Sequence, residues 1–334
     1  MGAVDSPTDL ELRDGHELRE GRVTGGLDQR LQRLADGHPS SLRYPDNRPP
    51  AGRGEPREVR RLTDAEHAEH VAEVRERLAD ACATGRETHV QFTLDRGREV
   101  WTDERDALHG GIVEDIYARC SEVPCDGKAI LAGGLPGAGK TTVLRDFADI
   151  DLSQYMMINP DVIKEEMAKR GLIPDVIGLS PMEASDLVHE EASHVAKRLA
   201  SRAESDGRNI IWDFTMSKTS TIADRIDSLR SAGYARIDGV FVDIPVEVSV
   251  QRADDRHRKG HDEYRAGIGL GDRYIGEATI LKHADSSWGS GNRKNFEELK
   301  PKLDGWSMFD NSVDGRAPVL VESHAARLKD GERT

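Results

Sequence analysis

Cysteine, aromatic residues and long apolar runs are all scarce in this chain. The three cysteines, Cys82, Cys120 and Cys125, form no C-x-x-C pair, which excludes a disulfide framework and a thiolate zinc site and indicates a reducing compartment. No run approaches the roughly 18 apolar residues of a membrane span, and the first residues lack the basic and then apolar pattern of a signal peptide. We therefore expect a cytoplasmic protein that does not act in a membrane.

Positive charge is also in the minority. The net charge is −14, with a pI near 5.4, and only 5% of the residues are aromatic. An acidic chain does not coat nucleic acid broadly, and few aromatic side chains are available to stack on bases. A local basic groove stays compatible with this composition, but we do not expect nucleic acid to be the main partner.

One glycine-rich segment carries most of the chemical information. The run from Gly134 to Thr141 matches G-x-x-x-x-G-K-[ST], the phosphate-binding P-loop. Glycines let successive backbone N–H groups turn toward phosphate oxygens, Lys140 reaches the β- and γ-phosphates, and the Thr141 hydroxyl can ligate Mg²⁺. The expected nucleotide-binding residues are Leu135, Pro136, Gly137, Ala138, Gly139, Lys140, Thr141 and Thr142.

The surrounding pattern predicts an α/β fold with a parallel sheet flanked by helices. Apolar strand-like runs alternate with helical stretches from Lys128 onward. Expected strands are Ala129–Ala132, Tyr155–Asn159, Asn209–Asp213, Ile237–Asp243 and Trp306–Asn311. Expected helices are Lys140–Phe147, Asp161–Arg170, Met182–Ser205, Lys218–Ala232 and Val246–Arg258.

The rest of the chain divides by composition. Residues 1–58 read as a polar, weakly ordered arm, 59–126 as a small, mainly helical extension, 127–322 as the P-loop domain, and 323–334 as a tail. Within the extension, Thr63 and Thr102 are expected to cap two helices, with a strand over His89–Leu94 between them. His67 and His70 have helical i, i+3 spacing, which is compatible with a metal site, but no Cys accompanies them, and we assign them to a solvated helix face.

Acidic residues follow two of the expected strands, where ligands of parallel sheets gather. Asp161 fits a general base that accepts a hydroxyl proton during phosphoryl transfer, or a residue that stabilises a helix N-terminus. Asp213 fits a Mg²⁺ ligand, direct or through water, or the cap of the next helix. Both alternatives stay open for each residue.

Arginines cluster where the lid of a kinase would lie. Arg252 and Arg256 share a helix face at i, i+4 spacing, and either could stabilise the charge of a transferring γ-phosphoryl group. The alternative is a solvated, charged helix end.

The ordered set of motifs resembles the zeta-toxin family of P-loop kinases and, more loosely, chloramphenicol phosphotransferase and polynucleotide kinase. The resemblance covers about residues 126 to 321. It is carried by Gly134–Thr141, Ile158–Asp161 with Lys164, His189–Ser193, Asn209–Thr215, Gly271–Ile275 and Phe309–Ser312.

The resemblance implies roles for individual residues. Asp161 would be the base, Lys140 the phosphate contact, and an arginine within residues 252–258 the transition-state stabiliser. For the substrate, Glu191 would help to hold it, Thr215 would line its pocket, and Arg273 would bind an anionic group. The chain departs from the family pattern at Phe214, where the family commonly has Gly, and at Gly276, where Pro often stands.

These observations favour an ATP- or GTP-dependent, Mg²⁺-requiring phosphotransferase that acts on a hydroxyl group of a small molecule. The resemblance implies UDP-N-acetylglucosamine or another sugar or nucleotide metabolite as the acceptor, a toxin-like action, and an antitoxin-like protein partner. One alternative is a polynucleotide or nucleoside kinase. Another, from a different class, is a nucleotide-gated binding component of a toxin–antitoxin assembly.

Overall fold

The computed structural model describes residues 59–97 and 99–325. The expected arm 1–58 and most of the expected tail lie outside the described residues. No helix within the described ranges is long and apolar enough to cross a membrane.

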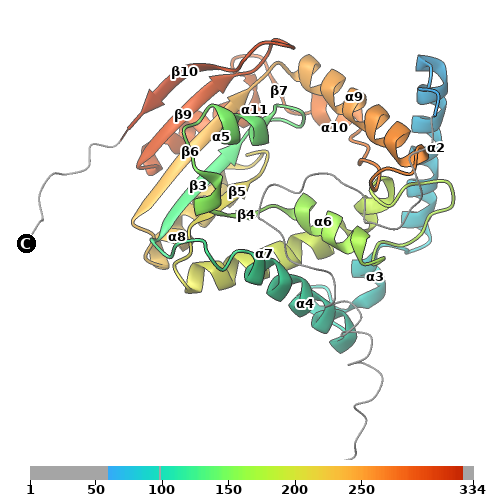
Figure 1. Ribbon diagram of the computed structural model, residues 1–334, viewed down its shortest axis with the longest axis horizontal. Helices are drawn as coiled ribbons and strands as arrows, with labels where there is room; N and C mark the ends of the chain where they lie inside the picture. The colour runs from blue at the N-terminus through green and yellow to red at the C-terminus, as the bar shows by residue number, and fades with distance from the viewer. Residues whose placement is uncertain (1–58, 98, 326–334) are drawn as a thin grey trace, which may run out of the picture. The chain divides into compact units, whose positions relative to one another are not determined.

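A six-stranded sheet forms the centre of the described chain (Figure 1). Its order is β10-β9-β6-β3-β5-β4, and all neighbouring pairs are parallel except β9 with β10. The strands are β3 (Lys128–Gly133), β4 (Met156–Ile158), β5 (Ile210–Asp213), β6 (Arg236–Asp243), β9 (Gly305–Asp310) and β10 (Val319–His324). The expected α/β fold is confirmed, but the antiparallel strand β10, whose six residues are all exposed, was not foreseen.

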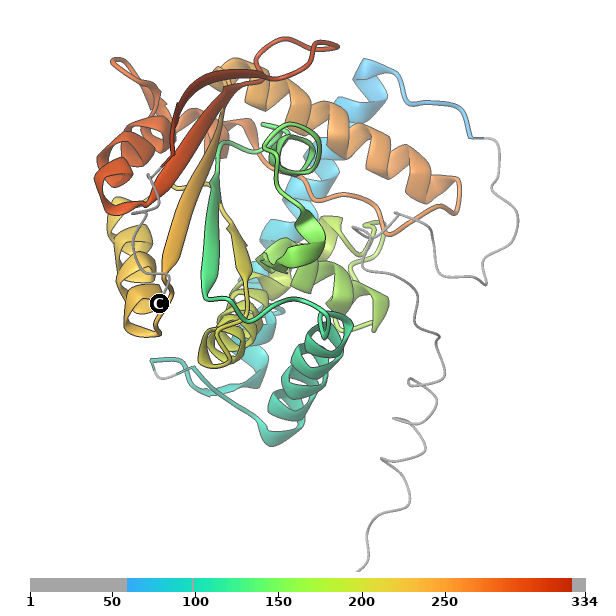
Figure 2. The ribbon, with the colours of Figure 1, turned by 60° about the vertical axis from the view of Figure 1, so that its left-hand side comes forward.

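Helices cover both faces of this sheet (Figures 1 and 2). Alternate residues of β3 point to opposite faces, so that Ala129 and Leu131 join one core cluster while Ile130 and Ala132 join the other. The first cluster includes residues of α4 (Asp103–Arg119), α6 (Pro160–Lys169), α7 (His189–Ser205), α8 (Thr219–Ser231) and α11 (Gly291–Leu299). The second includes residues of α5 (Lys140–Asp146), α9 (Val246–Arg265) and α10 (Glu277–Leu281).

A third, smaller cluster joins the N-terminal extension to the P-loop region. Val74 and Ala81 of α2 (Asp64–Ala83) pack with Leu187 of the 3₁₀ helix η2 (Glu183–Val188) and with Val176 and Leu179. The remaining elements are α3 (Thr88–Phe92), β1 (Thr93–Asp95), β2 (Val100–Trp101), η1 (Leu152–Gln154), β7 (Ala284–Asp285), β8 (Gly289–Ser290) and η3 (Lys300–Lys302). Residues of α4 and of β3 belong to the same core cluster, the first of the two on the sheet. The boundary expected near residue 126 therefore falls between two elements that share one core.

The predictions that Thr63 and Thr102 cap two helices are confirmed. The Thr63 side chain accepts from the Glu66 N–H while the Glu66 carboxylate accepts from the Thr63 N–H, which is the expected capping box. Thr102 caps α4 in the same position, accepting from the Arg105 N–H.

Two expectations about the extension were wrong. Residues 88–92 form helix α3, where a strand over His89–Leu94 was expected. Thr88 is buried in this helix, and its hydroxyl group donates to the Leu187 carbonyl, so tertiary packing overrides the local pattern. His67 does not lie on a solvated face: it is 3% exposed, and its Nε2 lies 3.0 Å from Asp254 Oδ1 of α9.

The long helix expected over Met182–Ser205 is divided in two. Glu183 Oε2 accepts from the Ser180 N–H at 2.7 Å, and Ser180 Oγ accepts from the Glu183 N–H at 3.3 Å. This reciprocal pair begins η2, and the α-helical geometry of α7 starts only at His189.

Candidate active site

The P-loop joins β3 to α5, in the order that the motif requires. Gly137 and Gly139 have φ of +70° and +82°, a region that favours glycine. A Cβ on Gly139 would lie 2.6 Å from Asn311 Nδ2, and one on Gly137 would lie 2.9 Å from Arg252 Cβ. Both glycines are therefore required by backbone conformation and by close neighbours, and those neighbours mark Asn311 and Arg252 as part of the site.

Lys140 links the P-loop to the end of the adjacent strand. Its Nζ donates to the Gly134 carbonyl at 3.3 Å and lies 3.5 Å from Asp213 Oδ1. The other carboxylate oxygen of Asp213 accepts from Asn159 Nδ2 at 2.9 Å. This arrangement connects the P-loop, β5 and the start of α6 through three side chains.

Asp213 has the environment of a cation ligand. Burial raises the pKa of its carboxyl group, partly offset by Lys140 and by the hydrogen bond from Asn159. Oδ1 is buried and has no hydrogen-bond partner in the described structure, so it fits a Mg²⁺ ion, or water bound to Mg²⁺, held also by Thr141. Asp213 does not cap the next helix: α8 begins at Thr219, its N-cap residue is Lys218, and no side chain caps it.

Asp161 lies at the start of α6 but does not cap it. The cap is Asn159, whose Oδ1 accepts from the Asp161 N–H at 2.7 Å. The Asp161 carboxylate instead lies 3.1 Å from Arg273 Nη2 and 3.8 Å from Lys164 Nζ, and it is 40% exposed. It is thus held by positive neighbours and open to an incoming hydroxyl group.

Lys164 is a residue of this site to which the sequence assigned no role. It is fully buried, its Nζ makes no hydrogen bond within the described chain, and the nearest carboxylates, Asp161 and Asp186, lie 3.8 and 3.7 Å away. Burial lowers the pKa of its ammonium group, and the charge of Arg273 adds to this effect. Such a cation is placed to receive an anionic or hydroxyl-bearing ligand.

The two candidate arginines of α9 lie at different places. Arg252 donates to the Gly137 carbonyl at 3.4 Å and pairs with Asp314 at 2.6 Å, so it lies against the P-loop. Arg256, one turn later, pairs with Asp272 at 3.0 Å, next to Arg273. The helix therefore spans from the P-loop to the Asp161 side.

The other predicted substrate residues have surroundings that sequence reasoning did not foresee. Glu191 is 1% exposed, and its carboxylate accepts from Arg105 and His109 of α4. For Thr215, the structure gives a main-chain contact: its carbonyl accepts from Asn292 Nδ2 at 2.5 Å. Their roles toward a substrate remain predictions.

Two hollows flank these groups. One, of about 630 Å³, lies beside the C-terminal end of β6 and is lined by Asp243, Trp288, Arg293 and Ser312, close to Asn311, whose Nδ2 donates to the Ala138 carbonyl. The other, of about 620 Å³, is lined by Arg75 and Glu76 of α2 and by Asp186 and Tyr274. The first adjoins the P-loop side and the second adjoins the Lys164 side.

Comparisons with known proteins agree with this architecture. Residues 114–287 match the family model described as zeta toxin. Two solved structures of AvrRxo1-ORF1 in complex with AvrRxo1-ORF2, one with sulphate ions and one with ATP, are each 19% identical at a TM-score of 0.56, covering 72% of this chain and 77% of that chain. This level of identity establishes a shared fold.

A calmodulin calcium-dependent NAD kinase of Arabidopsis thaliana is 30% identical over 113 residues, which are 30% of this chain and 20% of that protein. The chain thus matches about a fifth of the length of this relative. The family model covers more than half of the chain, and therefore the chain belongs to the zeta toxin family. The order of the sheet, the P-loop and the strand-end residues is as expected, and the chain has the α/β fold of a P-loop kinase.

Proposed function

We propose that this protein is a phosphotransferase that moves the γ-phosphoryl group of ATP or GTP to a hydroxyl group of a small molecule, with Mg²⁺ as cofactor. The observation that carries the proposal is the continuous chain of contacts from Lys140 through Asp213 and Asn159 to Asp161. It joins a phosphate-binding loop, through the end of β5, to the backbone of Asp161 after β4, and the Asp161 carboxylate is the base in this proposal. A base for an acceptor hydroxyl group is a requirement of a kinase.

Each group then has a defined task. Lys140 and the P-loop N–H groups hold the β- and γ-phosphates, and Thr141 and Asp213 hold the metal. Asp161 accepts the proton of the attacking hydroxyl group. Arg252 stabilises charge on the phosphoryl group from the P-loop side, while Arg256 acts from the Asp272 side.

The acceptor lies on the Asp161 side in this proposal. Lys164 and Arg273 give this side two cations near the carboxylate, which suits an acceptor with phosphate groups. The hollow that includes Arg75 and Asp186 extends from this side to the N-terminal extension. Glu191 and Thr215 would position the acceptor or the walls around it.

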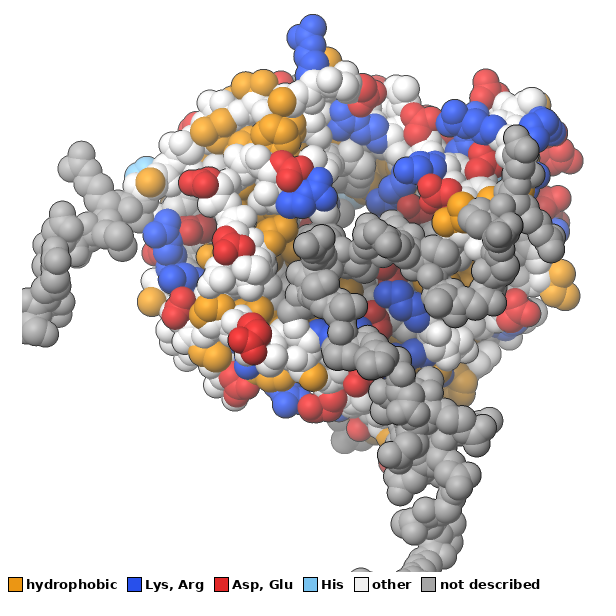
Figure 3. All heavy atoms as spheres, in the orientation of Figure 1, with side chains coloured by type: hydrophobic (Ala, Val, Ile, Leu, Met, Phe, Trp, Pro, Cys, Tyr) orange, Lys and Arg blue, Asp and Glu red, His pale blue; other side chains and the backbone are white. Residues whose placement is uncertain are grey.

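We propose a nucleotide metabolite as the acceptor class, with UDP-N-acetylglucosamine and NAD as the first two compounds to test. Family membership supports the first, and the name of the Arabidopsis relative, an NAD kinase, supports the second. A polynucleotide acceptor ranks lower. In the described part of the face in Figure 3, Lys and Arg side chains are interspersed with Asp and Glu, and the net charge is −14.

The test is phosphate transfer from labelled ATP to each compound and to a 5′-hydroxyl oligonucleotide. We expect a product with NAD or UDP-N-acetylglucosamine, none with the oligonucleotide, and no product with Lys140→Ala or Asp161→Asn. A metabolite extract incubated with protein and ATP extends the search to other acceptors by mass spectrometry. If no species gains a phosphate, or if both variants keep full transfer, the proposal is wrong.

We further propose a protein partner of the antitoxin kind. The solved structures of AvrRxo1-ORF1 with AvrRxo1-ORF2 support such an assembly for a protein of this fold. Removing residues 1–58 and measuring both transfer and complex formation separates the functions. Retained transfer with lost binding assigns the arm to the partner, whereas a full-length chain without turnover on any acceptor favours a nucleotide-gated binding role.

A further inference from the structure

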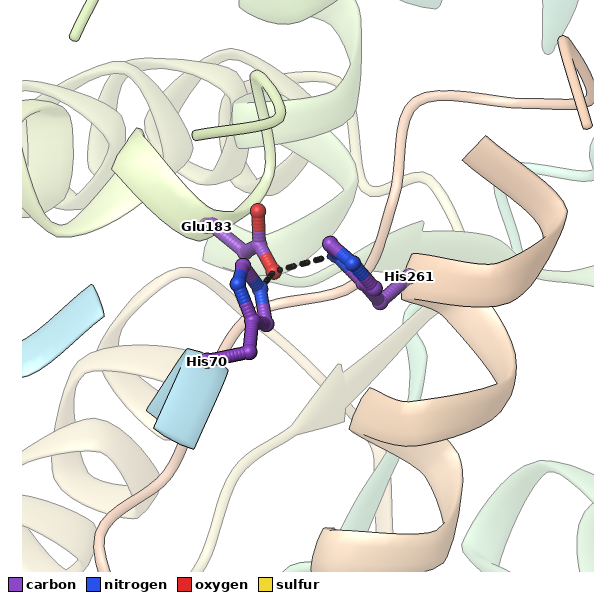
Figure 4. Close-up of side chains that lie close together, drawn as sticks. All are labelled: His70, Glu183 and His261. Atoms are coloured by element: carbon purple, nitrogen blue, oxygen red, sulfur yellow. Dashed lines mark hydrogen bonds and ion pairs between the residues drawn. The ribbon is translucent and has the colours of Figure 1, made fainter. Parts of the chain in front are cut away.

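Three side chains from distant parts of the chain converge on one point (Figure 4). His70 comes from α2, Glu183 from η2 and His261 from α9. Glu183 Oε1 lies 2.6 Å from His70 Nε2 and 3.1 Å from His261 Nδ1. The side chains are 10%, 0% and 12% exposed, so the group is almost completely shielded from solvent.

The carboxylate is fixed so that only one oxygen faces the imidazoles. Oε2 accepts from the Ser180 N–H at 2.7 Å, whereas Oε1 also lies 3.0 Å from Nε2 of the fully buried His257. Burial alone would raise the pKa of Glu183, but the hydrogen bonds from His257, His261, His70 and Ser180 outweigh burial and hold it well below its usual range. The geometry therefore presents Oε1 of Glu183 to the imidazole nitrogens, while Oε2 is occupied by the Ser180 N–H.

We propose that His70, Glu183 and His261 bind a divalent transition-metal ion, with Zn²⁺ as the best match. Two imidazole nitrogens and one carboxylate oxygen form a donor set that Zn²⁺ commonly takes, and the three ligand atoms lie within 4.8 Å of one another. Bonds of about 2.0–2.2 Å in a tetrahedral site would place ligand atoms about 3.3–3.6 Å apart. The separations of 2.6 Å and 3.1 Å from Glu183 Oε1 to the two histidine nitrogens are shorter than this, so the side chains would move apart by up to about 1 Å when an ion enters.

The surroundings also supply the outer shell that such sites use. His257 donates to the coordinating carboxylate oxygen and Ser180 to its partner oxygen, and these contacts orient Glu183. The nearby His67 is anchored on Asp254. The donor set differs from the proposed Mg²⁺ site, which offers only oxygen ligands, and this difference lets the two sites be filled independently.

The ion would tie the N-terminal extension to the helix that carries Arg252 and Arg256. α2, η2 and α9 meet at this cluster (Figure 4). On α9, His257 directly follows Arg256, and His261 lies five residues after Arg256. A bond network through a metal would hold these elements more firmly than hydrogen bonds alone.

The experiment uses the full-length, tag-free chain, stripped with a chelator and then titrated with Co²⁺ in excess Mg²⁺. We expect one Co²⁺ per chain, with the strong visible absorption of a tetrahedral site, displacement of Co²⁺ by Zn²⁺, and a rise in melting temperature when Zn²⁺ is added. If the wild-type chain binds neither Co²⁺ nor Zn²⁺, or binds them without a change in melting temperature, the proposal is overturned.

Variants locate the site. His70→Ala and His261→Ala should each weaken Co²⁺ binding by about 100-fold or more, whereas His89→Ala, a control histidine on α3, should leave it unchanged. Equal binding by all three variants would overturn the proposal. The wild-type titration decides the question even if a ligand variant fails to fold.

Discussion

The two sides of the candidate site are built in different ways. The P-loop side comes from one continuous run, Gly134–Thr141, whose positive φ angles and backbone N–H groups are set locally. The Asp161 side is assembled from α6, η2 and residues 272–274, with a wall from α2. The comparison shows that the P-loop is encoded locally, whereas the Asp161 side, where we propose that the acceptor binds, depends on long-range packing.

The largest effect should follow from removing the cation of the P-loop side. Lys140→Ala leaves the phosphates without their lysine, and we expect kcat/KM to fall about 10³-fold or more. Lys128→Ala, at the opposite end of β3 and half-exposed, is the control and should change little. Steady-state kinetics with labelled ATP measure both. A Lys140→Ala enzyme within tenfold of wild type would contradict the assigned role.

The next test addresses the carboxylate of the acceptor side. Asp161→Asn removes the proton acceptor while keeping the shape of the side chain, so kcat should fall about 10² to 10³-fold with little change in the KM for ATP. Asp115→Asn on α4, whose carboxylate pairs with Arg170 at the surface, serves as the matched control. A loss confined to the KM for ATP would show that the two sides are not separable as described.

Glu191 should matter first for stability. Its carboxylate is buried and paired with Arg105 and His109, so Glu191→Gln should reduce the free energy of unfolding by about 3 kcal/mol in urea denaturation. The control is Glu190→Gln, an exposed neighbour on α7. Unchanged stability with impaired acceptor binding would assign Glu191 to the substrate alone.

The same variant should show a defined pH dependence. Burial opposes ionisation of Glu191, but hydrogen bonds from His109 and Arg105 lower its pKa from 4.5 to about 2. A depressed folded-state pKa gives stability that is present above the unfolded value and is lost as pH falls through the folded value. The difference in unfolding free energy between wild type and Glu191→Gln should therefore shrink between pH 4.5 and about 2. A difference independent of pH in that window would contradict the ionised pair.

The smallest effect should come from Lys164. Replacing it with Met keeps the volume and removes a buried cation that makes no hydrogen bond in the described structure, so we expect the KM for the acceptor to rise about tenfold while the KM for ATP stays constant. Lys169→Met, at the other end of α6 and 40% exposed, is the control. A higher KM for ATP in place of the acceptor would move Lys164 to the P-loop side.

The accuracy of sequence reasoning follows the same division. The fold, the P-loop and both threonine caps were predicted correctly, because each depends on neighbours within a few residues. The surroundings of residues that contact distant parts of the chain were not predicted. Nothing near His67 in the sequence indicates Asp254, and no local pattern shows that Lys164 would be buried without a hydrogen bond.

Strand β10 and the divided helix show the same limit. β10 has no buried face, so its sequence carries no alternating pattern, and it forms because β9 offers it a free edge. The break between η2 and α7 depends on the contacts of Glu183 with Ser180 and with histidines of α2 and α9. Without these distant contacts, the sequence of Met182–Ser205 has the pattern of one continuous helix, and this is what we predicted.

The contacts between α2 and α9 also constrain how the chain is made. The partners His67 and Asp254 are separated by 187 residues, and Asp64 and Arg258 by 194. At a synthesis rate of about 5–20 residues per second, α2 leaves the ribosome roughly 10–40 s before its partners on α9 exist. Its apolar residues Val74 and Ala81 must remain soluble or chaperoned during that time, and the acceptor-side wall can close only when translation has passed α9. A nascent chain that ends before α9 would contain Gly134–Thr141 without the contacts that Arg252 and Asn311 make with this loop.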